Sequence, residues 1–173
     1  MKQIRRSVFE TNSSSTHSVS ISNKNSNMAN KACLSVDWDD FVHVEFGSFG
    51  WEQESYTEPY IKLQYLVTML IETEGDRISC KEELLELDGF KLINDAVAEY
   101  CDCSGIYIDS EFSINTATWC SDGSTYVEHD GYIDHQSCED YFSVEDFLNN
   151  YGVTATDFIF NTGVVLITDN DNY

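Results

Sequence analysis

The segment PYIKLQYLVTMLI, residues 59–71, decides how the neighbouring sequence folds. Pro59 suits the first turn of a helix, where its missing N–H needs no partner. Apolar side chains then recur with the helical repeat, which places them on one face: Tyr60, Leu63, Leu66, Val67, Leu70 and Ile71. The segment therefore predicts a helix from Pro59 that buries one face against the rest of the chain.

A second helical region follows this helix. Ser79 and Glu82 have the spacing of a capping box, and apolar residues recur between Leu84 and Val97 with a break expected at Gly89. We expect the region to end near Tyr100. Further along, Ser143 and Asp146 predict the start of a short helix that Gly152 closes.

Strands are predicted on both sides of the helices. Residues 17–21 and 41–46 alternate apolar and polar side chains, which is the period of a half-buried strand. Later strands are expected at 106–108, 117–119, 126–127, 132–133, 157–160 and 164–167, with Asp-Gly turns at 122–123 and 130–131. These elements predict a single α+β domain over residues 1–173, mainly antiparallel β-sheet with two or three helices.

Charge is the strongest global feature of the sequence. The 31 acidic and 9 basic residues give a formal net charge of −22. Lys91 is the last basic residue, whereas sixteen Asp or Glu follow it. Acidity of this kind usually marks a solvated surface. It also fits a surface that meets a strongly basic partner, such as a protein channel lined with Lys and Arg for nucleic acid, and it argues against direct binding of DNA or RNA.

The sequence contains no long apolar segment, and this predicts where the protein is located. No run approaches the length that spans a membrane, and the basic start MKQIRRSVFETN has no apolar stretch behind it to act as a signal peptide. We therefore expect a cytoplasmic protein without membrane contact. Thiols stay reduced in that compartment, so its 6 cysteines favour metal binding or core packing over disulfides.

The stretch from Tyr100 to Asp140 contains the candidates for a zinc centre. Structural zinc takes four Cys or His ligands in a tetrahedron. The predicted ligands are Cys101, Cys103, Cys120, Cys138 and His135, with His129 as a further alternative for the fourth position. Zinc would offset part of the local negative charge. Because paired C-x-x-C spacing is absent, buried thiols without metal are the competing interpretation.

Two other groups of residues have functional interpretations. His17, Asp134 and His135 could serve an enzyme as general base and partners, although no nucleophile elbow, H-E-x-x-H motif or phosphate loop accompanies them. Hydrogen-bonded structural histidines are the competing interpretation. The acidic pairs Glu139-Asp140 and Glu145-Asp146 are either solvated or act as phosphate substitutes that bind a basic partner, with Tyr141, Phe142 and Phe147 as apolar anchors.

Four segments carry a resemblance to a known family. They are RSVFETNSSSTHS (residues 6–18), FGSFGW (46–51), GYIDHQS (131–137) and the end of the chain from FIFN (158–161) through TDNDN (168–172). They resemble small proteins of phages and prophages of Gram-positive bacteria, and the resemblance runs nearly end to end. Ser48 stands where the family pattern would have an acidic residue.

Within that family, the size, acidity and cysteine content look like a zinc-containing type II-A anti-CRISPR protein. The resemblance implies binding to the recognition lobe of the RNA-guided DNA nuclease in the bacterial host cell and a block of target-DNA loading. Two other classes remain open: an enzyme of phage origin acting on a nucleotide or protein substrate, and a structural phage component. Because of the resemblance, we expect an inhibitor that acts by binding and has no chemistry of its own.

Overall fold

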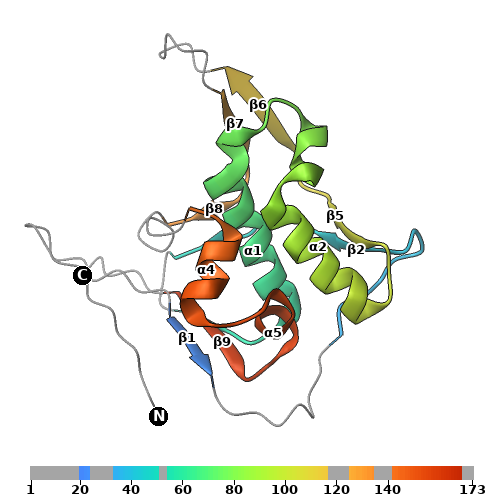
Figure 1. Cartoon of the computed structure of the whole chain (residues 1–173), viewed down its shortest axis with the longest axis vertical. Helices are drawn as coiled ribbons and strands as arrows, with labels where there is room; N and C mark the ends of the chain where they lie inside the picture. Colours follow the sequence, from blue (N-terminus) through green and yellow to red (C-terminus); the bar gives the residue numbers. More distant parts are fainter. Residues whose placement is uncertain (1–19, 24–32, 51–53, 117–124, 135–141, 169–173) are drawn as a thin grey trace, which may run out of the picture.

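Helix α1 (Pro59–Glu74) lies at the centre of the computed structural model, which describes residues 20–23, 33–50, 54–116, 125–134 and 142–168 (Figure 1). Pro59 occupies the first turn, as the sequence predicted. The helix is buried on more than one face, because every residue from Tyr65 to Ile71 is buried. Tyr60, predicted on the buried face, is instead 38% exposed.

Three further helices pack against α1: α2 (Asp88–Cys101), α4 (Val144–Tyr151) and α5 (Ala155–Phe160). In Figure 1, α2 lies on one side of α1, and α4 lies on the other. The buried ring of Tyr65 contacts Phe49, Phe147 and Phe158 with centroid separations of 5.2, 5.6 and 6.4 Å. Aromatic side chains from three other elements therefore pack against α1, which is why the helix is buried on more than one face.

The region between α1 and α2 forms two short 3-10 helices, η1 (Gly75–Arg77) and η2 (Lys81–Glu86), rather than a longer α-helix. The break falls at Leu87, whose backbone is extended, and not at Gly89. The capping box predicted between Ser79 and Glu82 does not form. The Ser79 N–H donates to Glu83 Oε2 at 2.7 Å instead.

The strands form several small sheets. One is three-stranded and antiparallel, with β9 (Val164–Thr168) between β1 (Ser20–Asn23) and β4 (Glu54–Tyr56). The strands β6 (Phe112–Thr116) and β7 (Thr125–His129) form an antiparallel pair that extends away from the helices in Figure 1. Two pairs are parallel: β2 (Phe41–Val44) with β5 (Gly105–Ile108), and β3 (Ser48–Phe49) with β8 (Tyr132–Ile133).

The α+β class predicted from the sequence is confirmed, with two differences. Residues 157–160, predicted as a strand, belong to α5, because the Thr154 side chain accepts from the Asp157 N–H at 3.0 Å and starts a helix. The described part thus contains four α-helices instead of two or three. Tyr132–Ile133 pairs with β3 instead of continuing the sheet of β7.

Other predicted elements agree with the structure or lie outside it. Helix α4 begins after Ser143, which accepts from the Asp146 N–H, and ends at Gly152 in the left-handed conformation, as predicted. The predicted strand 117–119 and the turn at 122–123 lie outside the described residues. None of the described helices combines the length and the apolar character needed to cross a membrane.

Candidate functional site

The turn Asp37–Asp40 presents an exposed tryptophan. The Asp40 N–H donates to Asp37 O at 3.0 Å, and the Asp37 N–H donates to Phe41 O at 2.9 Å. The Asp37 carboxylate accepts from the Trp38 N–H at 3.0 Å. Trp38 is 92% exposed on this hydrogen-bonded turn. A large ring held in solvent by an ordered backbone is typical of a binding surface.

The outward face of the parallel pair β2–β5 adjoins this turn. Val42 and Val44 of β2 are buried, so the alternation of the strand places Phe41 and His43 on the opposite face. His43 lies opposite Tyr107 of β5, and their ring centroids are 5.2 Å apart. Tyr107 is 53% exposed. We call this region the His43 surface. It consists of Trp38, Phe41, His43 and Tyr107 with the carboxylates of Asp37, Asp39 and Asp109.

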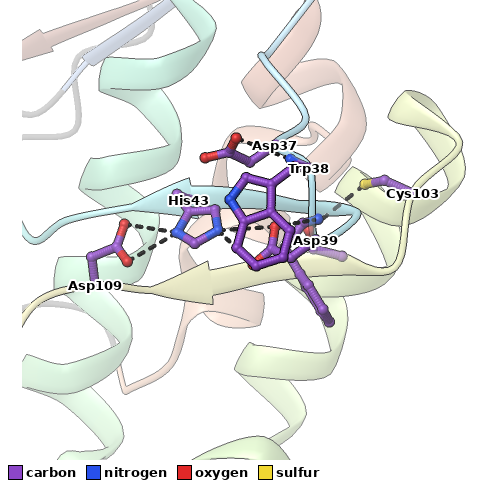
Figure 2. Close-up of polar contacts among 8 residues, drawn as sticks. Asp37, Trp38, Asp39, His43, Cys103 and Asp109 are labelled. Carbon is purple, nitrogen blue, oxygen red and sulfur yellow. Dashed lines mark hydrogen bonds and ion pairs between the residues drawn. The ribbon is translucent and has the colours of Figure 1, made fainter.

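His43 is held between two carboxylates, as Figure 2 shows. Its Nδ1 lies 2.9 Å from Asp109 Oδ1, and its Nε2 lies 2.9 Å from Asp39 Oδ2. The hydrogen bond to Asp109, and then that to Asp39, raises the pKa of His43. Because both ring nitrogens are engaged, His43 is a hydrogen-bonded imidazolium in this arrangement. Neither nitrogen is available to abstract a proton or to bind a metal.

The His43 arrangement predicts a pH-dependent contribution to stability. Because its folded pKa lies above the unfolded value of 6.5, the contribution is fully present below that value and is lost as the pH rises through the folded pKa. We expect urea unfolding to show a larger difference between wild type and His43→Gln at about pH 5.5 than at about pH 9.

His129→Gln is the matched control. Burial lowers the pKa of His129, so the wild-type protein should gain stability relative to this variant as the pH rises, which is the opposite sign. A His43→Gln difference that stays constant over the pH range would contradict the imidazolium assignment.

A groove of about 450 Å³ lies beside the His43 surface. It is lined by residues 33–37, by Val42 and His43, and by residues 58–60 at the start of α1. Val36 and Tyr60 are 39% and 38% exposed. Asp37 and Glu58 are its two carboxylates, and no Lys or Arg lines it. The groove therefore combines apolar surface with negative charge.

The four basic residues in the described part have hydrogen-bond or ion-pair partners outside the groove. Lys62 is buried and donates to backbone carbonyls. The others form ion pairs: Arg77 with Glu74 at 3.7 Å, Lys81 with Glu111 at 3.3 Å, and Lys91 with Glu86 at 3.1 Å. Lys62 also interacts electrostatically with Glu58, one helical turn before it. No Lys or Arg in the described part forms an ion pair with Asp37, Asp39 or Asp109.

The predicted zinc ligands are only partly within the described residues. Cys101 ends α2, and the Cys103 thiol contacts the Gly105 carbonyl oxygen at 3.7 Å. Burial raises the pKa of Cys101, and the nearby Cys103 and Cys33 add to the effect. Two thiols at one helix end would supply half of the tetrahedral ligand set that structural zinc takes. The remaining candidates, Cys120, Cys138 and His135, lie outside the described residues.

Zinc therefore stays a prediction. Among the residues that the structure describes, no group of three or more His, Cys, Asp or Glu side chains is arranged to hold a metal ion. His129, the further alternative ligand, is half-buried with its ring against Phe46 at 5.2 Å. If zinc binds, Cys101 and Cys103 would hold it and join the end of α2 to the other ligands, which is a structural role.

Of the three residues of the competing enzyme interpretation, the structure describes Asp134 alone, since His17 and His135 lie outside the described residues. Asp134 is buried, and its N–H donates to Phe49 O at 3.0 Å. The Tyr132 hydroxyl lies 3.4 Å from Asp134 Oδ1. These contacts hold Asp134 within the packing of β3 and β8.

Only some of the predicted partner-binding residues are within the described part of the chain. Glu145 and Asp146 are exposed in the first turn of α4, where a helix N-terminus favours negative charge. Phe142, beside them, is 78% exposed, but Phe147 is fully buried, so its predicted role as a surface anchor is wrong. Glu139 and Asp140 lie outside the described residues.

Sequence reasoning missed Asp37, Trp38, Asp39 and Asp109. Alternation in 41–46 did separate His43 from the buried positions, and the Asp-rich stretch before it could have indicated a turn. Nothing local identifies Asp109 as a partner of His43, because they are 66 residues apart and meet only through the parallel pairing of β2 with β5.

Comparison of the chain with protein-family models, curated proteins and solved structures gives no match.

Proposed function

We propose that the protein is an acidic inhibitor that binds a strongly basic surface of another protein. The observation that carries the proposal is the His43 surface, where exposed Trp38 and Tyr107 lie beside Asp37, Asp39 and Asp109. His43 pairs with Asp39 and Asp109, and no described Lys or Arg pairs with any of the three, so their charge stays in excess. Exposed aromatic rings within a charged rim are the usual anchors of protein interfaces. Complementary charge brings such partners together quickly and in the correct orientation.

The partner that we propose is a type II-A CRISPR RNA-guided nuclease, because the phage-family resemblance of the sequence implies it. Such nucleases hold nucleic acid in positively charged channels. An acidic protein on the recognition lobe would compete with the phosphates of target DNA and prevent its loading. Binding to the nuclease is sufficient for this inhibition, so no catalytic group is required of the inhibitor.

Titration of the purified nuclease with this protein tests the proposal. We expect one-to-one binding that weakens about tenfold or more as sodium chloride rises from about 50 to about 300 mM, because salt screens complementary charges. Trp38→Ala should weaken binding by about tenfold or more, as expected for a central aromatic anchor. Leu85→Ala, at a 55% exposed apolar position in η2, is the matched control and should have little effect.

Two results would contradict this function. Inhibition that is unchanged by salt would remove the electrostatic basis. Inhibition at substoichiometric amounts, with a modified product, would instead support the competing enzyme that uses His17, Asp134 and His135.

A further inference from the structure

We propose that the groove between residues 33–37 and the start of α1 binds an arginine side chain of the protein partner. This inference rests on the proposed function, since it names the chemistry that the acidic inhibitor recognises. The groove volume of about 450 Å³ is ample for one extended guanidinium side chain with its surrounding water.

The charge of the groove favours a cation. Asp37 and Glu58 line it. Of the four described basic residues, Lys62 is buried, donates to backbone carbonyls and also interacts electrostatically with Glu58, and the other three form ion pairs away from the groove. His43 also lines it, but the carboxylates of Asp39 and Asp109 hold its ring and offset its positive charge. The helix dipole places about half a positive charge at the start of α1, and this charge repels a cation. The ammonium of Lys62 offsets part of the charge of Glu58 as well. The two carboxylates of the groove exceed these contributions together, so the net charge of the groove is negative.

The apolar walls of the groove favour arginine over lysine. Tyr60 and Val36 line the groove and are partly exposed. A guanidinium is planar and weakly hydrated, so it packs against an aromatic face while it donates to a carboxylate. The ammonium of lysine is strongly hydrated and loses more on entering such a surface.

The carboxylates of the groove retain acceptor capacity. Asp37 Oδ1 accepts from the Trp38 N–H at 3.0 Å, and Glu58 Oε2 accepts from the Thr57 N–H at 3.2 Å. An ionised carboxylate has about four acceptor positions. Each residue can therefore accept a charge-assisted hydrogen bond from a guanidinium without losing its present contact.

Fluorescence anisotropy with labelled hexa-arginine and hexa-lysine peptides tests the inference on the full-length protein. We expect hexa-arginine to bind more tightly than hexa-lysine at physiological salt. Asp37→Asn with Glu58→Gln should weaken hexa-arginine binding about tenfold or more, since it removes both charged acceptors. Asp95→Asn with Glu99→Gln, at exposed positions of α2, makes the same change in net charge and should alter binding less than about threefold.

A third variant tests the wall of the groove. Tyr60→Ala should reduce the preference for hexa-arginine over hexa-lysine, because it removes the aromatic face. Equal weakening by the groove and control pairs, or equal binding of the two peptides, would overturn the inference. Thermal unfolding of each variant tests whether the fold is intact, and Asp37→Asn retains a side-chain oxygen that accepts from the Trp38 N–H.

The nuclease titration separates this inference from the proposed function. Loss of both peptide and nuclease binding in the groove variant supports both. Nuclease binding that survives in the groove variant overturns the arginine site and leaves the inhibitor function standing. If the wild-type protein binds hexa-arginine in the groove but does not bind the nuclease, the inhibitor function is overturned and the arginine site stands.

Discussion

Lys62→Ala is expected to lower the free energy of unfolding by about 3–4 kcal/mol, from lost hydrogen bonds and a buried cavity. Lys62 is fully buried in α1, and its ammonium donates to Asn161 O at 2.9 Å and to Val164 O at 3.1 Å. These carbonyls lie at the end of α5 and the start of β9. The side chain therefore connects the central helix to the C-terminal helix and strand.

Lys62→Met measures the contribution of the hydrogen bonds separately from that of the buried side-chain volume. It retains most of the buried side chain and should cost about 2 kcal/mol, because relief of ammonium desolvation offsets part of the lost bonding. Urea unfolding at neutral pH measures both variants. A cost for Lys62→Ala below about 1 kcal/mol would mean that the two carbonyls find other donors.

The pH dependence gives this prediction a second readout. Burial lowers the pKa of Lys62 from 10.5 to about 8. Between these values the unfolded chain binds more protons than the folded protein, so wild-type stability should rise with pH relative to Lys62→Met. The difference between the two proteins should therefore be larger near pH 10 than near pH 7.

Glu74→Ala is expected to lower the free energy of unfolding by about 3 kcal/mol, because it leaves buried helix donors without an acceptor. Glu74 ends α1 and is 2% exposed. Its carboxylate accepts from the Val144 N–H at 3.4 Å, in the first turn of α4, and from the Gly89 N–H near the start of α2. One side chain thus satisfies N-terminal donors of two helices.

Glu74→Gln tests whether the acceptor or the charge is needed. Glutamine keeps an acceptor oxygen in place, so it should cost about 1 kcal/mol or less. Burial raises the pKa of Glu74, so wild-type stability should fall relative to the Gln variant as the pH rises from 4.5 through the folded pKa. Chemical denaturation over this range provides the measurement.

Two other substitutions provide controls for Glu74. Glu99→Ala, on the exposed side of α2, should change stability by no more than about 0.5 kcal/mol. Gly89→Ala keeps the carboxylate but places a Cβ against Glu74 Oε1 and 2.7 Å from Leu70 Cδ1. It should therefore destabilise the protein. A Glu74→Ala variant as stable as Glu99→Ala would contradict the two-helix role.

Helix ends and alternating strands were predictable because their signals are local. Pro59 marked the start of α1, Ser143 and Gly152 marked the ends of α4, and 41–46 showed which side chains of β2 are buried. The strand predicted at 157–160 was wrong because the local signal there is ambiguous. Its apolar run suits a buried strand or a short buried helix equally, and the cap at Thr154 selects the helix.

The sequence by itself determined the α+β class, the central helix and the excess of negative charge, since these follow from short-range periodicity and composition. Only the tertiary structure decided where that charge is concentrated beside exposed aromatic rings. The parallel pairing of β2 with β5 brings Asp109 to His43, and the packing of α1 brings Glu58 and Tyr60 to the groove beside Asp37. Contacts between distant segments depend on how the elements pack, and no local pattern encodes that packing.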